Sequence, residues 1–261
     1  MVKDKVIVIT GASAGIGAAL AQQVARHGAK PVLVARRERA LAEIAAQCGD
    51  DALAIAADVT DRRAVTRALG RALERFGVID VWVNNAGRGI SRKVADLTDD
   101  DFDDMMRVNV KSALYGMQAV LPHFVERSRG QIINVSSMLG RLPLASFRSA
   151  YSAAKHALNA LTASLRLDLA YDHPDIVVTS VHPGVVATDF GLNALHGGVD
   201  SRALPGAQSA DEVAAVIVDA IVNPRADVYT RDETQRLVVD YFAADDMGAA
   251  EKKPPFFGPP R

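Results

Sequence analysis

A tyrosine and a lysine, Tyr151 and Lys155, lie four residues apart in the helix-like stretch YSAAKHALNALTASLRLDLAY (151–171). Residues at this spacing share one face of a helix. Free tyrosine has a pKa of about 10, and a nearby ammonium group stabilises the phenolate and lowers that value. The pair therefore suits proton exchange, with Tyr151 as general acid or base. The alternative is a polar loop that runs into an ordinary helix, because tyrosine and lysine also meet at this spacing by chance.

The segments that would position this pair alternate between short apolar runs and alanine-rich helices. Strands are predicted at 6–10, 31–35, 52–56, 78–84, 131–136 and 176–182, and helices at 16–28, 36–48, 62–77, 151–171 and 209–223. The last of these helices starts with Ser209 and Glu212 in capping-box positions. The strands are apolar on both faces, which is typical of a sheet covered by helices on both sides. The alternation predicts an α/β fold with an open, doubly wound parallel sheet. No linker divides the chain, so we expect one domain over residues 1–250 and a proline-rich, non-helical tail over 251–261.

The composition indicates a globular chain without a polyanion-binding surface. The chain has 30 basic and 31 acidic residues, for a formal charge of −1, and 49% of its residues are apolar. Cys48 is the only cysteine, so no intrachain disulfide can form and nothing indicates an oxidising compartment. The N-terminus lacks the apolar run of a signal peptide, and no run approaches the roughly 20 residues that span a bilayer. We therefore expect a soluble, cytoplasmic protein that binds neither nucleic acid nor membrane.

Three glycines follow the first predicted strand in the sequence TGASAGIG (10–17). Gly11 permits a sharp turn, Gly15 lets the backbone approach a pyrophosphate, and Gly17 lets the next helix pack closely on the sheet. The N–H groups at the start of that helix would then face the phosphates. Glycines alone indicate little, because turns need them. Their place between the first strand and the first helix predicts a dinucleotide site.

Two arginines follow the second predicted strand, where a dinucleotide site distinguishes between its cofactors. An acidic residue there would bind a ribose 2′-hydroxyl, whereas an arginine favours a 2′-phosphate. The strand ends VLVARRE, with no carboxylate before Arg36 and Arg37, and the planar fork of arginine fits phosphate geometry. This predicts NADP(H) in preference to NAD(H). A solvated basic start of a helix is the alternative, and Ala14 in the glycine loop adds no second positive charge.

Five motifs in register resemble the short-chain dehydrogenase/reductase family. They are TGASAGIG (10–17), NNAG (84–87), INVSS (133–137), YSAAK (151–155) and VHPGVVAT (181–188). The resemblance spans about residues 5 to 230. It implies a single-domain Rossmann-like fold with about seven strands, and hydride transfer between a nicotinamide and a carbonyl or secondary alcohol. It also implies a homodimer or homotetramer that forms through helices around 101–127 and 151–171.

The resemblance assigns a role to each matching residue. The implied catalytic residues are Asn109, Ser137, Tyr151 and Lys155. Ser137 would bind the substrate oxygen, Lys155 would hold the nicotinamide ribose, and Asn109 would position a water in the proton relay behind the lysine. The implied cofactor-binding residues are Gly11, Ser13, Ala14, Gly15, Ile16, Gly17, Arg36, Arg37, Asp58, Val59, Asn85, Ala86, Gly87, Tyr151, Lys155, Pro183, Gly184, Val186 and Thr188.

The predicted substrate side departs from the family in one place. The gap from Ser137 to Tyr151 is one residue longer than the family's most frequent spacing, which places an extra residue in the loop RLPLASFRSA (141–150). The segment DFGLNALHGGVDSRALPG (189–206) is the expected substrate loop, and its paired glycines predict mobility. A partly apolar pocket is predicted from Phe190, Leu192 and Leu195, whereas His196 is interpreted as a surface residue.

The acidic run LTDDDFDDMM (97–106) resembles a cation site but is interpreted as a helix start, capped by Thr98 and acidic in its first turn. The histidines lack metal-ligand spacing, so no catalytic metal is expected. The leading hypothesis is an NADP(H)-preferring carbonyl reductase or alcohol dehydrogenase acting on a small molecule. The alternatives are a dinucleotide-binding sensor or scaffold without turnover, and an epimerase acting on nucleotide sugars, for which the chain is short.

Overall fold

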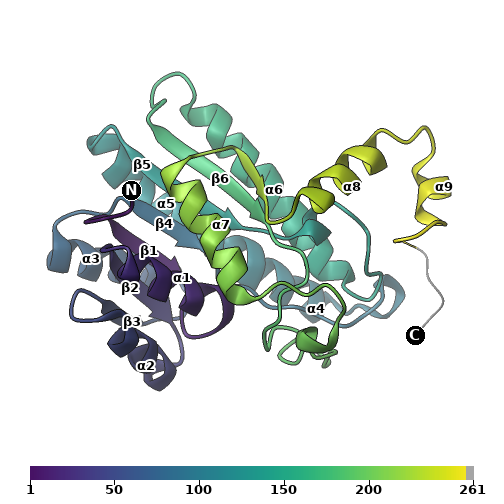
Figure 1. Ribbon diagram of the computed structural model, residues 1–261, viewed down its shortest axis with the longest axis horizontal. Helices are drawn as coiled ribbons and strands as arrows, with labels where there is room; N and C mark the ends of the chain where they lie inside the picture. Colours follow the sequence, from purple (N-terminus) through teal and green to yellow (C-terminus); the bar gives the residue numbers. More distant parts are fainter. Residues whose placement is uncertain (257–261) are drawn as a thin grey trace.

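The computed structural model describes residues 1–256, and in this part of the chain seven strands form one parallel sheet (Figure 1). The strands are β1 (Val6–Thr10), β2 (Lys30–Ala35), β3 (Leu53–Ala56), β4 (Val81–Asn84), β5 (Gly130–Val135), β6 (Ile176–His182) and β7 (Asp227–Tyr229). Their spatial order is β3-β2-β1-β4-β5-β6-β7, with Val8 of β1 beside Val32 of β2 and Trp82 of β4. The order reverses between β1 and β4, and open α/β sheets bind ligands at such a switch point.

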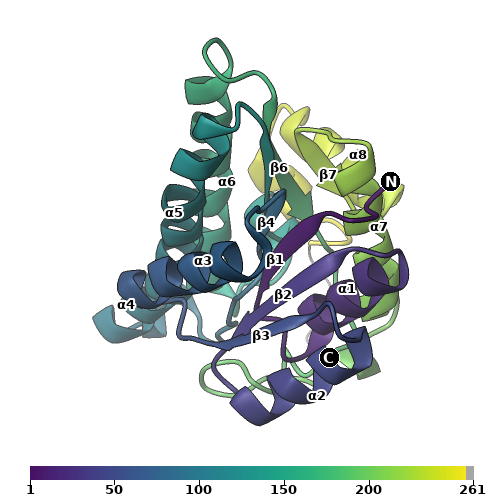
Figure 2. The same cartoon turned by 90° about the vertical axis from the view of Figure 1, so that its left-hand side faces the viewer.

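Helices cover both faces of this sheet. They are α1 (Gly15–Arg26), α2 (Glu38–Cys48), α3 (Arg62–Phe76), α4 (Asp99–Met106), α5 (Ser112–Glu126), α6 (Ser149–Leu169), α7 (Ala210–Val222), α8 (Asp232–Phe242) and α9 (Met247–Glu251). Figure 2 shows α3, α5 and α6 on one side of the sheet and α1 and α7 on the other. The Rossmann-like, doubly wound fold expected from the sequence is therefore confirmed.

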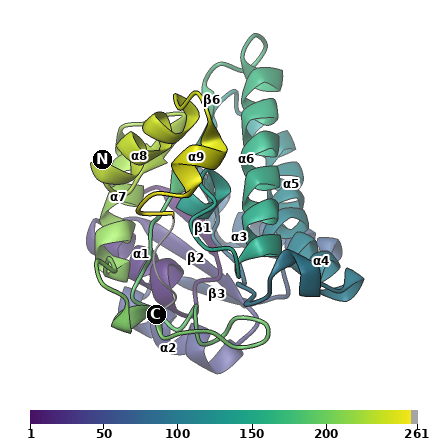
Figure 3. The same ribbon diagram turned by 90° about the vertical axis from the view of Figure 1, so that its right-hand side faces the viewer.

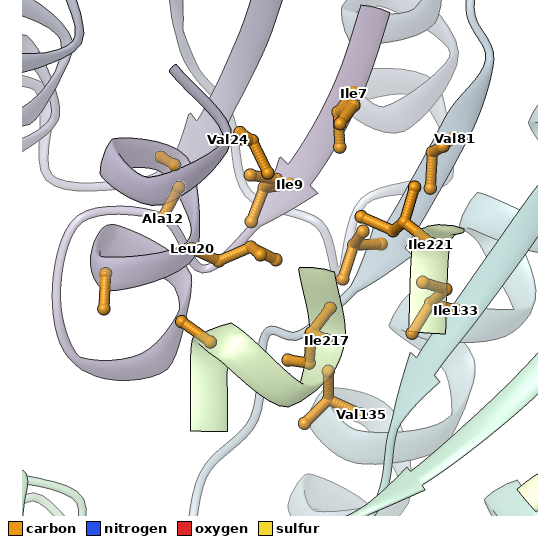
Figure 4. Packing of buried hydrophobic residues seen from close by; sticks show 14 of the residues in the cluster. Ile7, Ile9, Ala12, Leu20, Val24, Val81, Ile133, Val135, Ile217 and Ile221 are labelled. Carbon is orange, nitrogen blue, oxygen red and sulfur yellow. The ribbon is translucent and has the colours of Figure 1, made fainter. Parts of the chain in front are cut away.

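Alternating residues of β1 build the two halves of the core. Ile7 and Ile9 pack against Leu20 of α1 and Ile217 of α7 (Figure 4). Val8, which points to the opposite face, belongs to the core between the sheet and helices α3 and α5. Each fully buried aliphatic side chain stabilises the fold by roughly 1.5–3 kcal/mol, so β1 is anchored on both faces. This anchoring fixes the position of the turn that follows the strand.

The structure corrects two predicted boundaries. The strand expected at 78–84 begins only at Val81, because residues 78–80 form an irregular connection, in which the Asp80 carboxylate accepts from the backbone N–H of Val6 (2.9 Å) and pairs with Arg127 (3.1 Å). The helix expected from residue 36 begins at Glu38, so Arg36 and Arg37 lie in the connection after β2.

Two predicted helix starts agree with the structure. A capping box joins Ser209 and Glu212 at the start of α7. A second box joins Thr98 and Asp101 at the start of α4, as the acidic run predicts. Leu158, Leu161, Leu165 and Leu169 of α6, a stripe that suits either a core or a subunit interface, pack into the core.

The C-terminal part of the chain extends beyond the sheet. Helices α8 and α9 follow β7, and Figures 1 and 3 show them projecting past α7. Helix α9 includes Glu251, the first residue of the tail that was expected to be non-helical; residues 252–256 are not helical, and the remainder of that tail lies outside the described residues. Within residues 1–256, no helix combines the length and apolar character needed to cross a membrane.

Candidate active site

A cavity of about 1150 Å³ lies along the carboxyl ends of the strands. Residues that directly follow five different strands line it: Gly11 after β1, Arg36 after β2, Asn85 after β4, Ser136 after β5 and Pro183 after β6. The cavity is therefore at the position where an open α/β sheet binds its ligand. All the site residues expected from the sequence line it except Gly17 and Asn109, which lie directly behind its wall.

The glycines of the loop after β1 allow it to pack closely against the neighbouring backbone. Gly11 has a φ of +68°, a conformation that side chains rarely adopt, and a Cβ there would lie 2.9 Å from the Ala86 Cα. A Cβ on Gly17 would lie 2.5 Å from the Gly11 carbonyl oxygen, so this glycine allows α1 to pack against the turn. Ala14 at the N-cap provides no side-chain hydrogen bond to α1. The first N–H groups of the helix are thus available to phosphate oxygens, and the cradle fits a dinucleotide.

The two arginines after β2 occupy different positions. Arg37 folds back over the glycine loop and donates from Nη2 to the Ser13 hydroxyl (3.1 Å). Arg36 is exposed and lines the cavity. Across from them, burial tends to raise the pKa of Asp58, but hydrogen bonds from Thr60 and the charges of Arg36 and Arg107 lower it overall. Positive charge therefore predominates at this end of the cavity.

At the other end of the cavity, the structure brings Ser137, Tyr151 and Lys155 together. Ser137 follows β5, and the other two occupy the start of α6; all three are buried, at 7%, 7% and 3% exposure. The Lys155 Nζ donates to the backbone oxygen of Val135 (2.9 Å) and lies 5.7 Å from the centre of the Tyr151 ring. The ring packs edge-on against Phe190 of the expected substrate loop, with 5.4 Å between centroids. The Ser137 hydroxyl accepts from the Leu139 N–H (3.1 Å).

Burial dominates the electrostatics of this pair. It raises the pKa of Tyr151 to about 12, although the Ser137 side chain and the Arg148 charge act in the opposite direction. Burial also lowers the pKa of Lys155 to about 8. The lowering of the tyrosine pKa by the lysine ammonium, expected from the sequence, is not found: in the protein alone, desolvation of the phenolate raises that pKa. At neutral pH the tyrosine is protonated, the form that can donate a proton to a carbonyl oxygen.

Asn109 lies behind the lysine in a turn of π-helix, Arg107–Lys111, between α4 and α5. Its side-chain amide donates to the backbone oxygens of Arg88 (3.0 Å) and Met105 (3.1 Å), and its side-chain oxygen accepts from the Arg88 N–H (3.1 Å). A Cβ on Gly87 would lie 2.9 Å from that oxygen and 3.7 Å from the Lys155 Nζ. Asn109 therefore holds the loop after β4 close to the lysine. Single π-helical turns of this kind often occur at functional sites.

Two loops enclose the substrate side. The expected substrate loop is tied to the loop after β4, where the Ser91 N–H donates to the Leu195 carbonyl (2.9 Å). Its histidine, His196, does not line the cavity and pairs with Asp101 of α4 at 2.6 Å. Leu192 is exposed, whereas Phe190 and Leu195 pack in the cluster around Tyr151.

The second loop, 141–150, contains the extra residue and contacts the C-terminal part of the chain. Its Leu142 is fully buried against Val238 and Tyr241 of α8, while Leu144 lines the cavity. Helix α8 thus supports a wall of the cavity from behind.

Sequence reasoning missed one polar residue of this wall, Arg148. It lies in the same loop as Leu144, is 8% exposed and lines the cavity near Tyr151. The available signal was a basic residue three positions before the tyrosine, within a largely apolar loop. Across residues 1–256, no group of His, Cys, Asp or Glu side chains has the arrangement of a metal site.

Comparison with known proteins places the chain in a family. A family model of short chain dehydrogenases matches residues 5–197. An uncharacterized oxidoreductase of Staphylococcus epidermidis is 41% identical over 196 residues, which are 73% of this chain and 84% of that protein. A short-chain dehydrogenase/reductase of Burkholderia phymatum, solved in complex with NAD, superposes with a TM-score of 0.83 at 27% identity, covering 91% of this chain and 92% of that one. A short chain dehydrogenase of Burkholderia cenocepacia, solved in complex with NADP, has a TM-score of 0.82 at 26% identity, covering 99% and 100%. The chain belongs to the short-chain dehydrogenase/reductase family of oxidoreductases, whose fold binds a nicotinamide dinucleotide.

Proposed function

We propose that this protein transfers a hydride between NADP(H) and a carbonyl or secondary alcohol, with Tyr151 as the general acid and base. The observation that carries the proposal is the buried cluster of Ser137, Tyr151 and Lys155 at one end of a cavity whose other end is a glycine loop. One cavity thus joins a dinucleotide cradle to a proton donor.

The bound cofactor would supply or accept the hydride. In the direction of reduction, Tyr151 donates its phenolic proton to the substrate oxygen, and Ser137 stabilises the charge that develops there. Lys155 is held beside the phenol by its bond to Val135 and stabilises the phenolate left after the transfer. In oxidation the same phenolate accepts the proton of the alcohol. Asn109 fixes the loop next to Lys155. It would position the water of the relay that returns a proton to Tyr151 by way of Lys155.

The preference for NADP(H) is supported by the charges after β2. Arg36 lines the cavity and is exposed, and Arg37 lies over Ser13, so two guanidinium groups border the end where an adenosine ribose would lie. No acidic residue stands between the end of β2 and Arg37 to bind a 2′-hydroxyl and repel a 2′-phosphate. A 2′-phosphate would find positive charge there and an arginine fork that matches its geometry.

The assembly we propose is a homodimer or homotetramer, as the family resemblance implies, and the location is the cytoplasm. Helix α6 presents Leu167 (74% exposed) on its surface, and Tyr171 just beyond its end is 95% exposed. These residues are more accessible to a second copy of the chain than the leucine stripe, in which Leu158 and Leu169 are buried and Leu161 and Leu165 are partly buried. Light scattering that gives the mass of a single chain would contradict the assembly.

The test of the proposed function uses NADPH deuterated at each of the two C4 positions in turn, with a panel of ketones and aldehydes. We expect the deuterium of one isomer to appear on the carbinol carbon of the alcohol, because the hydride moves directly within the cavity. Tight binding of the cofactor without turnover of any carbonyl would contradict the proposal and favour a sensor or scaffold.

A further inference from the structure

Arg148 is a buried arginine in the wall of the active-site cavity. It directly precedes α6, three residues before Tyr151, and its exposure is only 8%. Its Nη1 donates to the backbone oxygen of Ile90 (3.1 Å), and its guanidinium lies 5.3 Å from the centre of the Phe147 ring. Arg148 and Tyr151 line the same cavity.

The positive charge of Arg148 has no acidic partner among residues 1–256. The other arginines near this part of the cavity do have such partners: Arg202 pairs with Asp189 (2.9 Å) and Asp200 (2.8 Å), and Arg88 pairs with Asp104 (3.4 Å). Burial lowers the pKa of Arg148, but arginine keeps its charge in proteins. A buried charge without a partner is costly to the fold, so a compensating anion is expected from outside the chain.

The residues around the Arg148 guanidinium leave the edge formed by its Nε and Nη2 nitrogens without a hydrogen-bond partner among the described residues. A Cβ on Gly89 would lie 2.9 Å from Nη1, and a Cβ on Gly198 would lie 3.2 Å from Nη2, so two glycines in two loops make room for the group. Neither Nε nor Nη2 donates to a described residue, and neither is among the fully enclosed atoms without a partner. These two nitrogens form the edge that binds a carboxylate through two parallel hydrogen bonds.

We propose that Arg148 binds a carboxylate of the substrate, so that the protein acts on keto acids and hydroxy acids in preference to uncharged carbonyl compounds. The inference rests on the proposed function, because it names the substrate class of the same site. With Nη1 held by Ile90, the free edge offers one donor to each oxygen of one carboxylate. Binding of the carboxylate at Arg148 would favour substrates with one particular separation between the carboxyl group and the carbonyl group whose oxygen faces Tyr151.

The test compares keto acids with their methyl esters. Pyruvate, acetoacetate, levulinate and 5-oxohexanoate place the two groups at increasing separations, and each methyl ester removes the charge by adding one methyl group to the carboxylate. For at least one separation we expect kcat/KM of the acid to exceed that of the ester by about tenfold or more, the range of a charged hydrogen bond. In Arg148→Gln the ratio falls to about one, and in Arg148→Lys it takes an intermediate value. Arg202→Gln removes a paired arginine from the same cavity and leaves the ratio unchanged.

The ratio separates recognition from a structural role. If Arg148 only holds Ile90 or only acts on Tyr151, Arg148→Gln lowers turnover of acid and ester alike, and the inference is overturned. Acids no better than esters at every separation also overturn it, although turnover of the esters would leave the proposed function intact.

If no acid or ester is turned over, binding decides the inference, and the panel of ketones and aldehydes separately decides the proposed function. Butyrate and hexanoate are then titrated against their amides into protein saturated with NADP⁺. Tighter binding of the acids that is lost in Arg148→Gln supports the inference. Equal binding of acids and amides overturns it.

Discussion

The Lys155 Nζ lies 5.7 Å from the centre of the Tyr151 ring and donates to the backbone oxygen of Val135 at 2.9 Å. Val135 is the last residue of β5, so the sheet itself holds the ammonium group beside the phenol. Both side chains are buried, and burial moves their pKa values in opposite directions, to about 12 for Tyr151 and about 8 for Lys155. This arrangement has consequences that can be measured in the protein without its cofactor.

The first prediction concerns the pH dependence of stability. The pKa of Lys155 is about 8 in the folded protein and 10.5 ordinarily, so between these values the unfolded chain binds more protons and the free energy of unfolding rises with pH. One proton limits that slope to about 1.4 kcal/mol per pH unit. The pKa of Tyr151 is raised from 10.0, so its contribution is complete below pH 10 and is lost as the pH approaches 12.

Urea unfolding of wild type and Lys155→Met across pH 7 to 10 checks this sign. The free energy of unfolding of the wild type, minus that of Lys155→Met, should increase as the pH rises. A difference that does not change with pH would show that the lysine is not desolvated.

The glycine loop gives a second prediction. Gly17→Ala places a Cβ 2.5 Å from the Gly11 oxygen and 2.6 Å from the Asn85 Nδ2, so we expect a loss of about 1–3 kcal/mol of stability and weaker dinucleotide binding. Gly70→Ala in α3 is the matched control, since nothing lies within 4 Å of the added Cβ. That variant should gain about 0.5–1 kcal/mol from helix propensity. Thermal unfolding with and without NADP⁺ measures both effects, and equal behaviour of the two variants would contradict the packing role of Gly17.

A third prediction concerns the choice of cofactor. Arg36→Ala should lower kcat/KM for NADPH about tenfold or more and leave the value for NADH nearly unchanged, because only the 2′-phosphate contact is removed. Arg39→Ala removes an equal charge from the outer surface of α2, where Arg39 pairs with Glu43 at 3.0 Å, and should change neither value. If Arg36→Ala affects both cofactors alike, the arginine does not distinguish between them.

The paired serines after β5 provide a fourth prediction. Ser137→Ala should lower kcat about 10²-fold, because it removes a donor to the oxygen on which charge develops. The neighbouring Ser136 makes only a long bond to the Lys155 carbonyl (3.5 Å), so Ser136→Ala should retain most of the activity. Steady-state rates of the two variants at saturating substrate make the comparison. The opposite order would assign the substrate contact to Ser136.

The parts of the fold that follow local rules were predictable from the sequence. The strand runs, the glycine turn and the caps at Thr98 and Ser209 each depend on a few neighbouring residues. The short strand β7 gave no apolar pattern, because only Val228 of its three residues is fully buried. The start of β4 was placed too early because the apolar Val78 and Ile79 continue the pattern of the strand, whereas the strand begins only after Asp80, whose carboxylate contacts Val6 from a distant part of the chain.

The site residues that belong to short motifs were also predictable from the sequence. Its motifs lie directly after strands, and parallel strands bring their carboxyl ends to one edge. The burial of Arg148 was not predictable, because it results from two glycines in loops that meet only in three dimensions, Gly89 and Gly198. The π-helical turn around Asn109 likewise has no signature in composition. The burial that raises the pKa of Tyr151 depends on packing that no short motif records.

One comparison tests most directly whether Tyr151 is the general acid. Oxidation of NADPH and NADH is measured against a broad carbonyl panel, including the keto acids, with wild type beside Tyr151→Phe. We predict wild-type turnover that prefers NADPH and falls about 10²–10⁴-fold in the variant, the range of general acid catalysis, while the Kd for NADPH changes less than about twofold. Equal turnover by wild type and Tyr151→Phe would contradict the account, because the proton would then come from another group.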